Sequence, residues 1–163
     1  MWRHGIVRAR AGLRGFTLIE MLATVAVLAV VSAVAAPGMR SFALSQRAKT
    51  LSYDLVQDLL VARSEALKRN MPVTVAPVGT SWATGWAVTA GGLQLSARPA
   101  DHAALVFDSA PASITFNIYG RVSAPVDPVR MTVRAGDITA DMTQRCVGLD
   151  PSGYAHSKMG ACK

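Results

Sequence analysis

A long apolar block from Phe16 to Ala36 constrains this chain more than any other feature of its sequence. An α-helix of about 20 residues crosses the hydrocarbon core of a bilayer, so the block is long enough to span a membrane. It contains one ionisable residue, Glu20. A charge at the centre of a membrane helix costs about 2.5–3.5 kcal/mol on insertion scales and needs a partner. The sequence therefore predicts a single-pass membrane helix in which Glu20 has a pairing role.

The charges on either side of the block indicate its orientation. The segment before it carries four basic residues and no acidic one, and a smaller group follows it. The positive-inside rule then favours a cytoplasmic N-terminus and a C-terminal part on the other side of the membrane. The leader accounts for much of the net charge of +7, because elsewhere 13 Lys and Arg stand against 10 Asp and Glu. The basic residues are Arg3, Arg8, Arg10 and Arg14 before the block, and Arg40, Arg47 and Lys49 after it.

Two other interpretations of the block are available. The small residues Val34-Ala35-Ala36 resemble the cut site of a secretory signal peptide, but Pro37 follows directly and the block exceeds the usual apolar core of about 7–15 residues. An ordinary signal anchor that happens to carry Glu20 near its cytoplasmic end is the second alternative.

The segment Arg14-Gly15-Phe16-Thr17-Leu18-Ile19-Glu20 resembles the class III signal of type IV pilins and type II secretion pseudopilins. This resemblance implies that a prepilin peptidase cleaves between Gly15 and Phe16 and methylates the new amino terminus at Phe16. It also implies that Glu20 pairs with a free amino terminus, its own or that of a neighbouring subunit. The membrane charge would thereby be compensated, and the register between assembled subunits fixed.

Beyond the block, the sequence predicts an amphipathic helix that continues the first one. Pro37 removes a backbone donor and predicts a kink. The helix can close at Asn70, which tolerates a left-handed conformation, and Pro72 follows as a stop. Apolar residues recur at spacings of three and four and form one stripe, namely Leu44, Ala48, Leu51, Leu55, Leu59, Ala62 and Ala66.

From Pro72 onward the apolar period changes to two, which predicts a mostly antiparallel sheet. Gly91-Gly92 is a two-residue hairpin signal, and Asp150 to Gly153 is typical of a tight turn. Trp82 and Trp86 flank the first strands and are expected to pack in the core or at a sheet edge. The candidate strands are 73–76, 85–89, 93–96, 114–119, 129–134 and 145–149.

This second region is similar to the GspH/FimT branch of minor pilins and pseudopilins, through Arg63-Ser64-Glu65-Ala66, Ile114-Thr115-Phe116, Gly120-Arg121, Arg145-Cys146-Val147 and Gly153. The resemblance implies an α+β, type IV pilin-like fold in which a long N-terminal helix packs on the sheet. The expected organisation is a removed leader over 1–15, a transmembrane helix over 16–36, its amphipathic continuation over 37–70 and a β-rich periplasmic head over 71–163.

Cys146 and Cys162 lie on the side of the block that this orientation places in an oxidising compartment, so we expect a disulfide that closes a C-terminal loop. A zinc site, the alternative, needs about four ligands, and no His cluster accompanies the pair. The sequence has no phosphate-binding, dinucleotide, hydrolase or metalloprotease motif. We therefore expect neither an enzyme nor a metal or cofactor.

Three functions remain open. The first is a minor (pseudo)pilin that assembles through its N-terminal helix with other minor and major pilins or pseudopilins and acts in filament initiation or at the tip. The second is a filament-displayed DNA receptor for natural transformation, although both arginines of the Gly-Arg-x-Arg motif of DNA-binding relatives are absent from Gly153-Tyr154-Ala155-His156. The third is a non-polymerising, membrane-anchored periplasmic domain. Weak DNA binding would use Arg121, Arg145, Lys158 and Lys163 as phosphate contacts and Tyr154 as a stacking group.

Overall fold

The computed structural model of the chain describes residues 15–99, 104–136 and 144–163, with the side chains of 34–37 outside that description. Helix α1 runs from Leu18 to Arg69 and has 52 residues. The chain as a whole divides into two compact units, Met1–Pro37 and Gly38–Lys163, and each is described separately. Apart from Gly15, the expected leader lies outside the described residues, and so do the Pro37 side chain and any test of the predicted kink.

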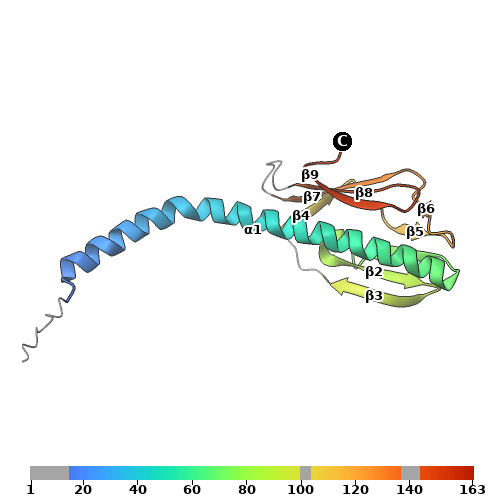
Figure 1. The fold of residues 1–163 in the computed structure, drawn as a ribbon, viewed down its shortest axis with the longest axis horizontal. Coiled ribbons are helices and arrows are strands. Elements are labelled where there is room, and N and C mark those ends of the chain that lie inside the picture. The colour runs from blue at the N-terminus through green and yellow to red at the C-terminus, as the bar shows by residue number, and fades with distance from the viewer. Residues whose placement is uncertain (1–14, 100–103, 137–143) are drawn as a thin grey trace, which may run out of the picture. The chain divides into compact units, whose positions relative to one another are not determined.

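In the second unit, the predicted apolar stripe of α1 is confirmed as the buried face of the helix. Its seven residues, Leu44, Ala48, Leu51, Leu55, Leu59, Ala62 and Ala66, are each at most 5% exposed. The predicted end is also confirmed, because Asn70 takes a left-handed φ of 52° directly after the helix. Figure 1 shows strands of both sheets running along this part of the helix.

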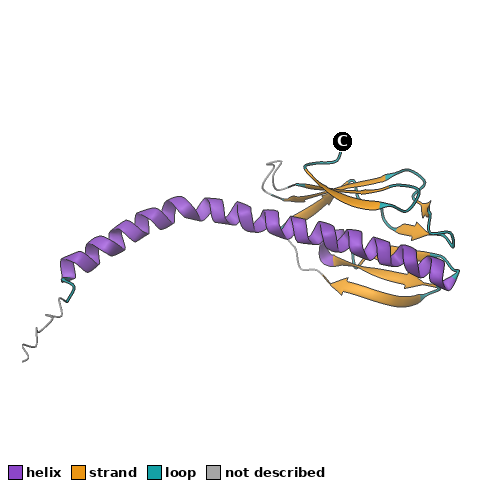
Figure 2. Ribbon diagram, in the orientation of Figure 1, coloured by secondary structure: helices purple, strands orange, loops and turns teal. Residues whose placement is uncertain are grey.

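Within the described residues, nine strands follow α1 and form two antiparallel sheets (Figure 2). Sheet A has the order β3-β2-β1-β5-β6, and sheet B has the order β4-β7-β8-β9. A short 3-10 helix, η1 (Trp82–Thr84), precedes β2. The strands are β1 (Val73–Pro77), β2 (Gly85–Ala90), β3 (Leu93–Pro99), β4 (Leu105–Asp108), β5 (Ile114–Phe116), β6 (Val122–Ala124), β7 (Val129–Ala135), β8 (Arg145–Leu149) and β9 (Ala155–Met159).

The division into two sheets differs from the single sheet that the period of two suggested. The chain passes to sheet B at β4, returns to sheet A for β5 and β6, and passes to sheet B again at β7. Pro125 and Pro128 lie between β6 and β7, and because a proline cannot donate to a ladder, the pairing of β6 ends there before sheet B continues at Val129. Val122 of β6 still donates its N–H to the carbonyl oxygen of Pro151 at 3.1 Å, which joins sheet A to the turn before β9.

The predicted hairpin is confirmed, since Gly91 and Gly92 both take positive φ values, 55° and 83°. The strand expected over 114–119 ends earlier, at Phe116. The reason is local: the side-chain oxygen of Asn117 accepts from the N–H groups of Tyr119 and Arg121, both at 3.0 Å, and folds the backbone into a turn. Strands β4, β6 and β9 were not predicted.

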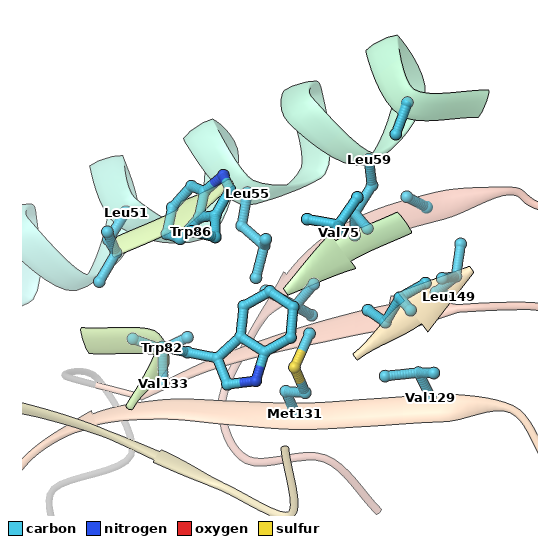
Figure 3. Close-up of a cluster of buried hydrophobic side chains, with 14 of the residues drawn as sticks. Leu51, Leu55, Leu59, Val75, Trp82, Trp86, Val129, Met131, Val133 and Leu149 are labelled. Atoms are coloured by element: carbon cyan, nitrogen blue, oxygen red, sulfur yellow. The ribbon is translucent and has the colours of Figure 1, made fainter. Parts of the chain in front are cut away.

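The core lies between α1 and the inner faces of both sheets (Figure 3). Trp86 is fully buried and Trp82 is 3% exposed, which confirms the expected packing role of both rings. The indole N–H groups are satisfied, because Trp82 donates to the carbonyl oxygen of Pro111 at 2.7 Å and Trp86 donates to the carboxylate of Asp58 at 2.8 Å. Buried aromatic rings supply much of the apolar area of a small core.

Asp58 of α1 links the helix to the outer strand of sheet A. Besides Trp86, it accepts from Nε of Arg98 at 2.7 Å and from Nη2 at 3.3 Å. This hydrogen-bonded pair raises the pKa of the Arg98 guanidinium above its ordinary value. Arg98 also lies 3.7 Å from a carboxylate oxygen of Asp54, one turn earlier. The edge strand β3 is thereby tied to α1.

Candidate functional site

The start of α1 carries the expected assembly residues. Thr17 caps the helix, because its hydroxyl accepts from the N–H of Glu20 at 3.3 Å and its carbonyl accepts from the N–H of Met21 at 3.1 Å. The helix thus begins just after Gly15 and Phe16, and Glu20 lies in its first turn. The Glu20 side chain is exposed, and Phe16 is 77% exposed. A charged group and a bulky apolar group are both available to another molecule at this end.

The large apolar side chains on both sides of Glu20 do not pack into a hydrophobic core. Large side chains from Leu18 to Val31 are between 56% and 79% exposed. Among the described residues, no helix alone meets the length and hydropathy expected of a membrane span, whereas Leu18–Ala33 and Gly38–Arg69 meet them together as a bent pair.

The second candidate site is a groove on the outer face of sheet B with a volume of about 530 Å³. Strands β7, β8 and β9 build it because alternate residues of each strand point away from α1. In register across the three strands, Arg130 faces Gly148, which faces His156, and Thr132 faces Cys146, which faces Lys158. The groove is lined by three basic residues, Arg130, Lys158 and Lys163, by one acid, Asp150, and by the imidazole of His156.

A disulfide between Cys146 and Cys162 closes one side of this groove and confirms the predicted pairing. After β9, the chain turns back over the outer face of sheet B. The N–H of Cys162 donates to the hydroxyl of Thr132 at 3.0 Å, and Arg130 donates to the backbone oxygen of Lys163. We call residues 160–163 the C-terminal strap, since they cross β8 and reach β7.

An aromatic pair stands beside the groove. The rings of Tyr154 and His156 stack with centroids 5.9 Å apart. The imidazole of His156 lies over Gly148, where an added Cβ would come within 2.6 Å of the ring. Its Nδ1 is buried and has no hydrogen-bond partner among the described residues. Glycine at position 148 is therefore required for the ring to lie flat on the sheet.

The structure separates the five residues expected to contact DNA. Lys158 and Lys163 line the groove, and Tyr154 stacks on one of its walls. Arg121 is exposed in the turn before β6 and does not line the groove. Arg145 is only 8% exposed, so the expectation that it offers an open cation is wrong. In the strand register, Arg145 lies opposite Met159 on β9 and Val133 on β7. Its side chain points to the inner face because it directly precedes the outward-facing Cys146.

Sequence reasoning missed Arg130, and it predicted no strand over His156, which lies on β9. A signal for Arg130 was present in the sequence. In the predicted strand 129–134, Val129, Met131 and Val133 alternate with Arg130, Thr132 and Arg134, which places the two arginines on the outer face. Among the described residues, no group of three or more His, Cys, Asp or Glu side chains is arranged to hold a metal ion.

Comparison with known families accounts for both parts of the chain. The family model described as type II transport protein GspH matches residues 52–153, which is more than half of the sequence. The chain belongs to the GspH family. The prokaryotic N-terminal methylation motif matches residues 11–36, which include Gly15, Phe16 and Glu20. The family consists of pilin-like structural subunits rather than enzymes.

Solved structures show the same fold as this GspH-family chain. Two crystal structures of the type IV minor pilin FimU from Pseudomonas aeruginosa are similar to it, in space groups P65 and P21. The match to the first structure has 20% identity and a TM-score of 0.55, and it covers 68% of this chain and 91% of the FimU chain. The second has 19% identity and a TM-score of 0.57, with coverages of 70% and 88%. No curated protein sequence matches the chain significantly.

Proposed function

We propose that this chain is a minor pilin or pseudopilin of a type IV pilus or type II secretion pseudopilus, which enters the filament through its N-terminal helix and acts in filament initiation or at the tip. One observation carries the proposal. The methylation motif ends in an apolar helix whose large side chains are exposed, and that helix leads directly into a GspH-family head. An exposed apolar helix is stable only in a membrane or against other apolar helices.

The residues at the start of α1 receive their roles from this proposal. A prepilin peptidase removes 1–15 by cleavage between Gly15 and Phe16 and methylates Phe16. Thr17 starts the helix two residues from the cut, so the new amino terminus lies close to the first turn that holds Glu20. A carboxylate at this position attracts both the helix N-terminus and a free amino group.

The proposed topology has a membrane helix over 16–36, an amphipathic continuation over 37–70 and a periplasmic head over 71–163, with the N-terminus cytoplasmic in the inner membrane. The disulfide fits an oxidising compartment. Before assembly the helix lies in the membrane, and after assembly it packs against neighbouring pilin helices.

Intact-mass analysis of the membrane-extracted protein tests this function. Cells with the peptidase are expected to yield a chain that begins at methylated Phe16, and cells without it a chain that keeps the leader. Immunodetection in sheared filaments then separates a subunit from a non-polymerising membrane domain. A mature chain that begins at Phe16 but never enters filaments would support the non-polymerising alternative.

The alternative function as a DNA receptor has less support from the residues that would carry it. Arg145 is buried, and Arg121 lies outside the groove. Three cationic side chains, Arg130, Lys158 and Lys163, remain around the groove, together with the imidazole of His156. We propose that DNA binding by this chain is weak and independent of sequence.

A further inference from the structure

Strand β9 ends sheet B, and within the described residues no strand pairs with its outer edge. The N–H of Gly160 donates to the carbonyl of Gln144, and the N–H of Asp150 donates to the carbonyl of Tyr154, both at 3.0 Å. In an antiparallel ladder, hydrogen-bonded pairs alternate with non-hydrogen-bonded ones. The backbone groups of residues 154, 156, 158 and 160 therefore face β8. Those of Ser157 and Met159 face the free edge.

This edge is open at its C-terminal end. Met159 is 65% exposed and Lys158 is exposed, whereas Ala155 at the other end is 5% exposed. An open strand edge can be extended by another chain in the extended conformation. The free length, from Ser157 to Met159, is enough for a short added strand.

The side chains beside the edge define which segment fits. His156 and Lys158 point to the outer face and border the groove, where Arg130 and Lys163 add positive charge. In an added strand, alternate side chains would lie on this outer face, directly opposite His156 and Lys158, with Cβ atoms about 4.5–5.5 Å apart. A carboxylate opposite Lys158 would face a cation across the strand pair, and one opposite His156 would lie beside an imidazole.

We propose that the free edge of β9 binds an extended acidic segment of a partner protein, which becomes a fifth strand of sheet B. The inference rests on the proposed function, because it names a partner for a filament subunit. A nucleic acid would use the cations but not the backbone groups of Ser157 and Met159. A second copy would place its own Lys158 near the first, and from Gly38 onward each copy carries 13 Lys and Arg against nine Asp and Glu.

Met159 provides a matched pair of variants. Met159→Pro removes the outward N–H while leaving every bond between β9 and β8 in place, because Met159 sits in a non-hydrogen-bonded pair with Arg145. Met159→Ala shortens the same exposed side chain but keeps the N–H. Lys158→Gln removes one cation that faces the proposed strand.

The probe is a fluorescein-labelled octapeptide in which Glu alternates with Thr and Val, titrated by anisotropy against the full chain in detergent. A peptide with Gln for Glu and a single-stranded thymidine oligonucleotide are compared with it. We expect the acidic peptide to bind about tenfold more tightly than the Gln peptide, with Met159→Pro weakening binding about tenfold and Met159→Ala less than about twofold. Lys158→Gln should weaken binding of the acidic peptide and leave binding of the Gln peptide unchanged.

Equal binding by Met159→Pro and Met159→Ala would overturn strand addition, as would equal binding of the Glu and Gln peptides. Tighter binding of the oligonucleotide that is unaffected by Met159→Pro would replace the acidic segment with a nucleic acid. Circular dichroism and thiol counting confirm that each variant is folded and oxidised. Failure of the proposed function is recognised separately, by absence of the wild-type chain from filaments.

Discussion

Arg63 of α1 donates a hydrogen bond from Nη1 to the carbonyl oxygen of Gly153, 90 residues later, at 3.4 Å. The same side chain passes Gly120, where an added Cβ would lie 3.2 Å from Cγ and Nε of Arg63. Gly153 has a φ of 84°, and an added Cβ there would come within 2.3 Å of the carbonyl oxygen of Gly120. The helix and one turn from each sheet therefore meet where two glycines leave room for one arginine.

Gly153→Ala should strongly destabilise the head, because the new methyl group collides with a backbone oxygen and the backbone takes a positive φ. Gly160→Ala is the control, since Gly160 has a similar φ of 90° with nothing within 4 Å. We expect the free energy of unfolding to fall about 1–3 kcal/mol further for Gly153→Ala than for the control. Urea unfolding followed by tryptophan fluorescence measures both. Equal losses of unfolding free energy for the two variants would show that the turn can shift enough to avoid the collision.

Asp58→Ala should cost about 1–3 kcal/mol of stability, because it leaves the indole N–H of fully buried Trp86 without its acceptor. Asp54→Ala is the matched control on the same helix face. Its carboxylate is 3.7 Å from Arg98 and partly exposed, so its loss should cost less than about 1 kcal/mol. Thermal unfolding by circular dichroism compares the two variants, and similar melting temperatures would contradict the assigned role of Asp58.

The disulfide should hold the C-terminal strap on sheet B. Cys146 and Cys162 are 16 residues apart, and closing a loop of this size contributes about 3 kcal/mol on the chain-entropy model. Mature protein should show no free thiol until it is reduced. Reduction, or Cys162→Ser, should lower stability by this amount and increase amide exchange around Thr132. Full thiol labelling without reductant would contradict the pairing.

Glu20→Ala should leave membrane insertion intact, because it removes the one charge from an apolar segment. Assembly should fail, since the variant lacks the group that pairs with an amino terminus. Membrane fractionation and sheared-filament immunoblots measure the two steps separately, and Glu20→Asp keeps the charge as a comparison. An Ala variant that enters filaments as well as the wild type would rule out the pairing role.

DNA binding by the head should be weak. From Gly38 onward the chain has 13 Lys and Arg against nine Asp and Glu. With three or four phosphate contacts, affinity on duplex should fall with roughly the 0.9 power of salt concentration per contact. We expect little association near about 150 mM salt and no sequence preference at lower salt. A submicromolar affinity at that salt, lost when Arg130, Lys158 and Lys163 are changed together, would favour the receptor function.

The sequence predicted the elements whose periodicity is long and regular. The stripe from Leu44 to Ala66 extends over about six turns of α1, and Gly91-Gly92 has the residues that a tight hairpin needs. Strands β4, β6 and β9 were missed because they are short and mostly edge strands. In β9, the apolar alternation is weak because the inward positions hold the small Ala155 and the polar Ser157, which contacts Ser52 of α1.

Only part of the candidate site could be predicted from the sequence, because the rest depends on strand register. Residue types and motif positions indicated Gly15, Phe16, Glu20 and the two cysteines. The groove depends on strand register, and a shift of one residue reverses the face of a side chain. That phase places Arg145 inside and Arg130 outside. Their charge is identical, so composition alone does not separate them.

The hydroxyls of Ser52 and Ser157 are hydrogen-bonded at 3.0 Å although they are 105 positions apart in the sequence. The ribosome synthesises α1 before β9, and β9 then covers part of the helix. Until β9 has been synthesised and folded back, the middle of α1 remains open to water on that side. A chain that stops before Ala155 thus presents an apolar helix surface to proteases and chaperones, and only a full-length head can hide it.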